Sequence, residues 1–156
     1  MSAIDIVHAY EKSPLGQFFI TINNNWVIAF QIVHVFSILT VLTAIVVLAL
    51  RAFGLISFEQ SNERFARLFF RAVGVGLGGA IVSGVLLFMT SATHYFTNKA
   101  FPFKLIFLAV AAFVEFVVFK KLFIHSERQT ATKLVALLSV ILWFLTGFAG
   151  RAIGFV

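Results

Sequence analysis

The stretch WVIAFQIVHVFSILTVLTAIVVLAL, residues 26–50, runs for 25 residues without a formal charge. As a helix that rises about 1.5 Å per residue, it is longer than the roughly 30 Å of hydrocarbon in a bilayer. Its few clearly polar residues are Gln31, His34, Ser37, Thr40 and Thr43. The stretch therefore predicts a transmembrane helix that is long enough to tilt.

Three more apolar stretches follow along the chain, at residues of about 70–93, 102–121 and 133–155. Each is long enough, at about 1.5 Å per residue, to cross or nearly cross the hydrocarbon core. Together with 26–50 they predict an all-α fold, a four-transmembrane-helix bundle. Residues 1–156 then form a single integral membrane domain.

The polar-rich start of the chain also carries a helix signal. Ser13 suits an N-cap, and Pro14 suits the first helical position after it. Apolar residues then recur at helical spacing, at Leu15, Phe18, Phe19 and Ile22. This pattern predicts a short N-terminal interfacial helix. The connector at 93–101 is expected to be a tight loop.

The composition supports a lipid solvent. Hydrophobic residues make up 61% of the chain and charged residues only 12%, and phenylalanine alone contributes 21 residues. A soluble core of this size could not bury so much apolar surface. The absence of cysteine excludes disulfides, thiolate metal sites and thiol catalysis. No phosphate-binding loop, catalytic carboxylate pair or nucleophile elbow is present, which argues against hydrolysis and phosphoryl transfer.

The net charge of +6 is concentrated in two connectors, a pattern typical of membrane topology and not of nucleic-acid binding. The first and third connectors contain Arg51, Arg64, Arg67, Arg71, Lys120, Lys121, Arg128 and Lys133. The opposite side of the predicted bundle has half as many basic residues, Lys12, Lys99, Lys104 and Arg151. We therefore expect a multi-pass protein of the bacterial inner (cytoplasmic) membrane with both termini in the periplasm.

Three basic or potentially basic residues fall at one predicted depth. Counted from the basic ends of their helices, His34, Lys104 and Arg151 lie about 25, 24 and 27 Å toward the outer face. Their neighbours in this outer layer are Met89 and Thr90 at the same level, Gln31 one turn above His34, and His94 and Tyr95 at the outer end of the second helix. Glu115 lies too far toward the inner face to neutralise the layer. We expect it to pair with arginines of the inner loops or with a helix neighbour.

Simpler explanations compete for each of these residues. Lysine and arginine near helix ends commonly reach the headgroups with their charged tips. A lone histidine inside a membrane can serve as a hydrogen-bond donor between helices. His34 lies about 12 Å below Trp26, a candidate interfacial anchor, so its ring is out of reach of water by side-chain flexing. It is therefore expected to face the interior of the bundle.

A layer of cations without carboxylates favours an anionic or carbonyl-bearing ligand. Haem b fits if His34 is the iron ligand and the propionates pair with Lys104 and Arg151. A quinone fits if His34 and a cation form hydrogen bonds with its carbonyl groups. A lipid phosphate is a third choice.

For haem, the second axial ligand stays open. His94 is predicted about 9 Å above His34, whereas Met89 is nearly level with it. A metal ion held by Gln31, His34 and His94 lacks a reinforcing carboxylate or thiolate.

The second helix reads GVGLGGAIVSG, residues 74–84, with small residues spaced four apart. Such spacing lets helix backbones approach closely. It serves packing within the bundle, a homo-oligomer, or room for a flat cofactor, and packing is the commonest of the three.

Several segments together resemble a known family. They are SPLGQFF, QIVH, LALRAFG, NKAFPFKLIFL and KLVALLSVILWFLTGFAGRAIGFV. Over nearly its whole length the chain resembles a family of small bacterial four-helix integral membrane proteins of uncharacterised activity. The resemblance implies the four-helix fold and a site at His34, Lys104 and Arg151, but no reaction. Relatives often have Glu where this chain has Gln31, which weakens any proton-transfer role there. Membrane cytochromes b are a looser analogy.

Three functions remain as hypotheses. The first is a membrane-embedded cofactor-binding protein, for haem b or quinone, with electron transfer to a periplasmic or membrane redox partner. The second is a scaffold or accessory subunit that binds lipid or a partner protein without catalysis. The third is an oligomeric channel or transporter. The sequence leaves open whether any reaction is catalysed.

Overall fold

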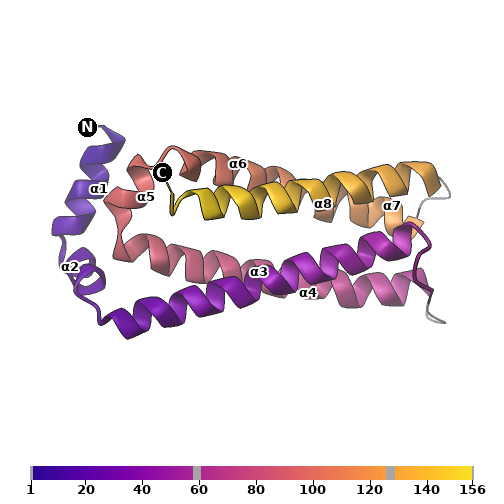
Figure 1. Ribbon diagram of the computed structural model, residues 1–156, viewed down its shortest axis with the longest axis horizontal. Helices are drawn as coiled ribbons and strands as arrows, with labels where there is room; N and C mark the ends of the chain where they lie inside the picture. Colours follow the sequence, from indigo (N-terminus) through magenta and orange to yellow (C-terminus); the bar gives the residue numbers. More distant parts are fainter. Residues whose placement is uncertain (1, 58–60, 126–128, 156) are drawn as a thin grey trace.

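Four segments are long enough and apolar enough to cross a membrane, which confirms the predicted four-helix fold (Figure 1). The computed structural model describes residues 2–57, 61–125 and 129–155. The spans are α3 (Asn24–Ala52), α4 (Asn62–Thr90), a third span over Ala100–Ile124, and α8 (Gln129–Ala152). The chain is a multi-pass membrane protein with four candidate spans.

The third span changes its helical form in the middle. It begins as α6 (Ala100–Phe113), continues as the π-helical segment η1 (Val114–Phe119), and ends as α7 (Lys120–His125). In η1 the backbone N–H of Lys120 donates to the carbonyl of Glu115, five residues back. Such π-helical insertions are rare and occur often at functional sites.

Two short helices precede the spans. In α2 (Pro14–Ile20) the Ser13 hydroxyl accepts a hydrogen bond from the Gly16 backbone at 3.1 Å, so the predicted N-cap and helix are confirmed. The helix before it, α1 (Ala3–Lys12), was not predicted from the sequence, and Ser2 and Asp5 cap it reciprocally.

The connector at 93–101 is not a simple loop, so that prediction was wrong. It contains α5 (Ala92–Thr97), which restarts the helix after a break in backbone direction at Ser91. Asn98 then ends α5, and its side chain donates to the Ile153 carbonyl at 3.0 Å. This bond ties the connector to the last turn of the chain.

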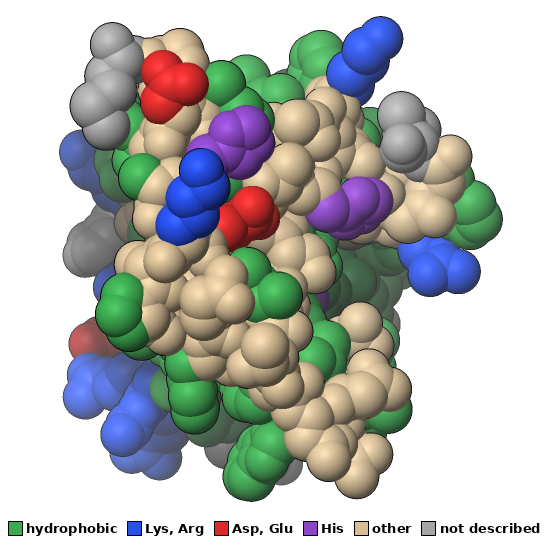
Figure 2. Space-filling view, turned by 90° about the vertical axis from the view of Figure 1, so that its left-hand side faces the viewer, with side chains coloured by type: hydrophobic (Ala, Val, Ile, Leu, Met, Phe, Trp, Pro, Cys, Tyr) green, Lys and Arg blue, Asp and Glu red, His purple; other side chains and the backbone are tan. Residues whose placement is uncertain are grey.

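The spans form two antiparallel pairs, α3 with α4 and α6 with α8 (Figure 1). Both termini lie at one end of the bundle, the terminal end, where α1, α2 and α5 are also found (Figure 1). The other end, the basic end, carries the two basic connectors. Of the basic residues assigned to these connectors, Arg128 lies outside the described residues. Figure 2 looks onto the terminal end, where polar and charged groups mix with apolar ones, as expected near headgroups.

The core is concentrated toward the basic end. On α3 every buried side chain lies between Val41 and Ala49, and none of the described residues 24–40 is buried. A group of phenylalanine rings closes this half, with centroids 4.5 to 6.4 Å apart, at Phe65, Phe69, Phe70, Phe119 and Phe123. The half of the bundle near the termini is therefore packed much less tightly.

Glycines bring α4 against α3. A Cβ atom at Gly76 would lie 2.8 Å from Val41 Cγ2 and 3.0 Å from the Ser37 carbonyl oxygen. Only a glycine permits this approach. By contrast, a Cβ atom at Gly74 or Gly78 would meet nothing within 4 Å. The small-residue spacing thus serves packing within the bundle on one face of α4, while its other face is left to the surroundings.

The N-terminal helices are fastened to the α4–α5 corner. The Tyr10 hydroxyl donates to the Met89 carbonyl at 3.0 Å, and the Glu11 carboxylate accepts from the Thr93 backbone at 2.9 Å. The hydrogen bond from Thr93 lowers the pKa of Glu11 below its usual value, so the carboxylate stays ionised at neutral pH. These two bonds hold α1 across the terminal end.

The glycine contact leads to the first prediction. Gly76→Ala should lower the unfolding temperature in detergent, because overpacking costs about 1–3 kcal/mol. Gly78→Ala is the matched control and should be neutral or gain up to about 1 kcal/mol from helix propensity. Thermal unfolding followed by circular dichroism measures both. Equal effects of the two substitutions would contradict the close approach of α4 to α3 at Gly76.

Candidate functional site

The loosely packed half of the bundle holds a pocket of about 570 Å³ between the two helix pairs. This volume falls in the range of about 300–1,000 Å³ that is usual for small-molecule sites. All four spans contribute to its lining, which is mainly apolar, with Leu42, Leu77, Leu108 and Phe88 among the contributors. All four spans of one chain thus build the pocket lining.

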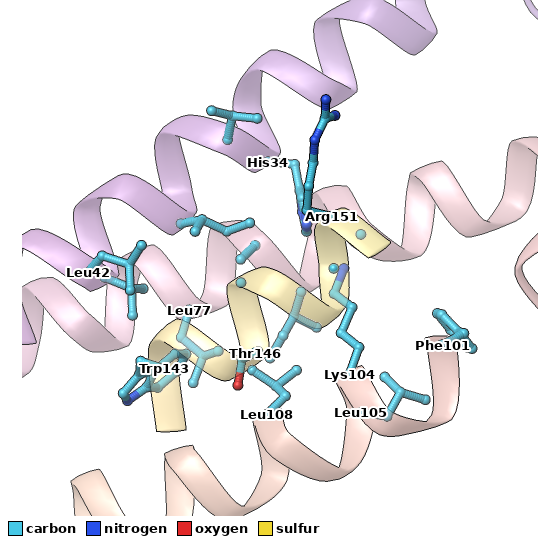
Figure 3. A pocket seen from close by; sticks show the side chains of 18 of the residues that line it. His34, Leu42, Leu77, Phe101, Lys104, Leu105, Leu108, Trp143, Thr146 and Arg151 are labelled. Carbon is cyan, nitrogen blue, oxygen red and sulfur yellow. The ribbon is translucent and has the colours of Figure 1, made fainter. Parts of the chain in front are cut away.

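Three polar residues of this lining are those predicted to share a depth. His34 of α3, Lys104 of α6 and Arg151 of α8 all line the pocket. Figure 3 shows their side chains gathered at one end of it, with Trp143 at the other. The helices are long and straight enough for counting along each of them to bring these three residues together.

A hydrogen bond to α4 sets the orientation of the His34 ring. Its Nδ1 lies 3.0 Å from the Ser83 hydroxyl oxygen. That hydroxyl donates its single proton to the Gly79 carbonyl at 2.6 Å, so it must accept from His34. Nδ1 therefore carries a proton, and in the neutral ring Nε2 has the free lone pair. The backbone carbonyl of Ala80, which also lines the pocket, accepts a second hydrogen bond from the ring.

The lack of a side chain at Gly84 leaves space for the His34 ring. A Cβ atom there would lie 3.2 Å from His34 Cε1 and 3.6 Å from Nδ1. The imidazole is thus pressed against the backbone of α4 while its edge lines the pocket. Ser83 and Gly84 were singled out in the sequence only as small residues, because depth alone does not show which side chain a histidine meets.

Lys104 crosses from α6 to α8. A Cβ atom at Gly150 would lie 3.4 Å from its Cε and 3.5 Å from its Nζ, so the lysine stem lies flat on that glycine. The side chain is half-buried, and no carboxylate or hydrogen-bond acceptor among the described residues contacts its ammonium group. A cation that is partly withdrawn from water without a partner favours an anion or a carbonyl oxygen nearby.

Arg151 is more open than Lys104. Its residue is exposed, and the guanidinium carbon lies 5.0 Å from the centroid of the Phe155 ring. The arginine lines the pocket and also lies within reach of the membrane surface. It can therefore contact a ligand headgroup at the pocket mouth while keeping part of its hydration.

The other candidates lie outside the pocket lining. Gln31 is exposed on α3. Met89 and Thr90 end α4, where the Thr90 hydroxyl donates back to the Leu87 carbonyl at 2.7 Å. His34 meets Ser83, six residues before Met89, so Met89 lies farther toward the terminal end than His34 and the estimate that set the two level was wrong.

Tyr95 and His94 belong to α5 and form a cover over the pocket. The Tyr95 ring lies 6.2 Å from Phe88 and 6.0 Å from Phe101, both of which line the pocket. The His94 ring packs edge-on against Tyr95, with ring centroids 5.5 Å apart. Burial raises the pKa of Tyr95, so its phenol stays protonated. His94 and Tyr95 thus lie next to the pocket lining without belonging to it.

The site contains few side chains that could bind a metal ion. Within the part of the chain that the structure describes, no three His, Cys, Asp or Glu side chains gather into a cluster. His34 is the one nitrogen ligand of the described pocket lining that combines a free lone pair with a fixed ring. A bound iron would thus rely on His34 from the protein side.

Comparisons of the chain with protein-family models, curated proteins and solved structures find no match. The resemblance to a family of small bacterial membrane proteins therefore stays a prediction. The geometry of the pocket is the basis on which a function can be assigned.

The tautomer of His34 gives the second prediction. In the apo protein, ¹⁵N NMR should show Nδ1 protonated, and at pH values where the ring is neutral it should show Nε2 unprotonated. Ser83→Ala should release the ring toward the Nε2–H form that free histidine prefers. Thr146→Val is the control, because Thr146 lines the same pocket and bonds to Leu142 without contacting His34. An Nε2–H ring in the wild type would contradict the assignment.

Proposed function

We propose that the pocket binds a quinone or quinol from the membrane, and that the protein has a redox or electron-transfer role. The observation behind this proposal is that hydrogen-bond donors and a hydrogen-bond acceptor gather at one end of an apolar pocket. Within the part of the chain that the structure describes, Lys104 and Arg151 are donors that form no ion pair with a carboxylate, and His34 offers an acceptor. Few membrane ligands have a head group that both accepts and donates hydrogen bonds and a remainder that is apolar.

The chemistry of a quinone head fits each of these groups. A carbonyl oxygen accepts a hydrogen bond from the Lys104 ammonium or the Arg151 guanidinium, and such charge-assisted bonds are strong. A quinol hydroxyl donates to the His34 Nε2 lone pair. The leucine and phenylalanine side chains of the pocket receive the ring and the start of its tail.

A lipid phosphate fits less well. Its oxygens are acceptors, so they would face the Nε2 lone pair of a neutral His34 without a proton between them. The two cations alone would suit a phosphate. The histidine therefore favours a head that can donate as well as accept.

Haem b is the second candidate, because the Ser83 hydroxyl fixes the tautomer that axial ligation requires. His34 would bind the iron, and Lys104 with Arg151 would hold the propionates. Haem would supply one-electron chemistry. Met89 and His94 lie outside the pocket lining, so the described residues offer no evident second protein ligand.

The charge distribution supports a redox site near the outer face of a membrane. We infer that the protein lies in the bacterial inner membrane with both termini and the pocket mouth on the periplasmic side, because the opposite end is the basic one. A periplasmic or membrane partner would then exchange electrons with the ligand. Reporter fusions at each terminus test this orientation, and a cytoplasmic C-terminus would overturn it.

Quinone binding can be followed from inside the pocket. Trp26 and Trp143 are the two tryptophans of the chain, and Trp143 lines the pocket. In a Trp26→Phe background, decylubiquinone should quench Trp143 fluorescence saturably. Lys104→Met should weaken that binding roughly tenfold or more, because a hydrogen bond to a charged group is lost. Lys99→Met is the control, since Lys99 is exposed and outside the pocket lining.

The outcomes separate the candidates. Unsaturable quenching, or equal affinity in the Lys104→Met variant, would contradict quinone binding. A Soret band in protein purified from haem-supplied cells, lost in His34→Ala, would replace quinone by haem b. Co-purification of phosphatidylglycerol without quinone, with competition by that lipid in vesicles, would point to a phosphate head and to an accessory role.

A further inference from the structure

A second polar site lies deeper in the bundle, at Glu115. This residue belongs to η1 and is fully buried, at 0% exposure. The Ser139 hydroxyl of α8 donates to Glu115 Oε2, so the expected pairing is with a helix neighbour and not with arginines of the loops. The other carboxyl oxygen, Oε1, is buried and has no hydrogen-bond partner among the described residues. One half of the carboxyl group is thus satisfied and the other half is not.

Cations on the elements packed against η1 do not neutralise this group. These elements are α6, α7 and α8, and their described basic side chains are Lys104, Lys120, Lys121, Lys133 and Arg151. Lys120 and Lys121 are exposed, and Lys104 and Arg151 lie at the pocket mouth. None of the five forms an ion pair with Glu115. A buried carboxylate without an ion-pair partner would face a large desolvation cost, which the neutral acid avoids.

Glu115 lies directly below the floor of the pocket. Leu108 lines the pocket, and Glu115 follows two turns later on the same face of the span, about 10 Å deeper. On α8, Trp143 lines the pocket and Ser139 is one turn deeper, about 6 Å away. Trp143 is thus the pocket-lining residue one helical turn from the Ser139 that bonds to Glu115.

The floor has an unusual property of its own. Trp143 is buried at 5% exposure, yet its Nε1 has no hydrogen-bond partner among the described residues. A donor and an acceptor, Trp143 Nε1 and Glu115 Oε1, are therefore both left unsatisfied in neighbouring layers of one helix interface. The π-helical turn of η1 adds a locally irregular backbone at the same level. Unpaired polar groups of this kind in a packed core call for a function.

We propose that Glu115 is an intramembrane proton-binding site, which holds a proton near neutral pH and exchanges it with the pocket when the Trp143 side chain moves. The bound species is the proton itself, held on the carboxyl group and released as H⁺ to leave the carboxylate. Ser139 stabilises either form, because it can donate to a carbonyl or to a carboxylate oxygen. This site does not depend on which ligand the upper pocket takes.

Infrared spectroscopy tests the protonation directly. Wild-type protein at neutral pH should show the carbonyl band of a protonated carboxylic acid, and Glu115→Gln should lose it. Absence of that band in the wild type would overturn the proposal. The substitution is close in shape and neutral, so the bundle should still fold.

A chemical label gives a second test that needs no variant. Dicyclohexylcarbodiimide reacts with protonated carboxyls in apolar surroundings, and mass spectrometry of wild-type peptides should find it on Glu115. Glu63 is the internal control, because it is exposed and paired with Arg67 at 3.1 Å. Labelling of Glu63 in preference to Glu115 would show that the buried carboxyl is ionised or out of reach.

The route through the pocket is tested by deuterium exchange of the infrared band. Trp143→Ala removes the floor and should speed the exchange at least tenfold, whereas Trp143→Phe keeps an aromatic floor and should leave it near the wild-type rate. Exchange at the wild-type rate in Trp143→Ala would overturn the route through the pocket. The protonation state of Glu115 would still be decided by the presence or absence of its infrared carbonyl band.

Discussion

The contact between α3 and α4 is the constraint on which the site depends. Gly76 lets the two backbones meet at Val41, and the helices then stay close enough for Ser83 and Gly84 to touch His34. In lipid, such packing and interhelical hydrogen bonds replace the hydrophobic driving force that would hold a soluble bundle together. The histidine is thereby fixed on one helix by atoms of another.

The same packing divides the bundle into two unlike halves. Toward the basic end, phenylalanine rings and the buried part of α3 leave little space, and Glu115 is enclosed there. Toward the termini the helix pairs separate, and Lys104 and Arg151 gather around a pocket. Both halves contain polar groups without countercharges, and Trp143 lies at the boundary. Local packing density explains both arrangements. Tight packing favours the neutral acid in one half, and loose packing keeps the cations accessible in the other.

The sequence could predict the shared depth of three site residues but not which side chains they meet. Long apolar runs indicated the four spans, and counting residues along rigid helices brought His34, Lys104 and Arg151 to one level. On α4 the depth was also misjudged, because counting set Met89 level with His34 although the ring meets Ser83, six residues earlier. The break at Ser91 and the π-helical turn at Glu115 also went unseen, because neither leaves a signal in hydropathy.

The apolar lining of the pocket contributes little to selectivity. A hydrocarbon tail gains almost nothing by leaving lipid for a pocket lined with leucine and phenylalanine, because the two environments are equally apolar. Lipid chains are also present in great excess over any cofactor. In the proposed quinone site, discrimination therefore comes from the head, where His34 requires a donor while Lys104 and Arg151 require an acceptor. Since Ser83 holds the imidazole in one tautomer, this demand is built into the contact between α3 and α4 before any ligand arrives.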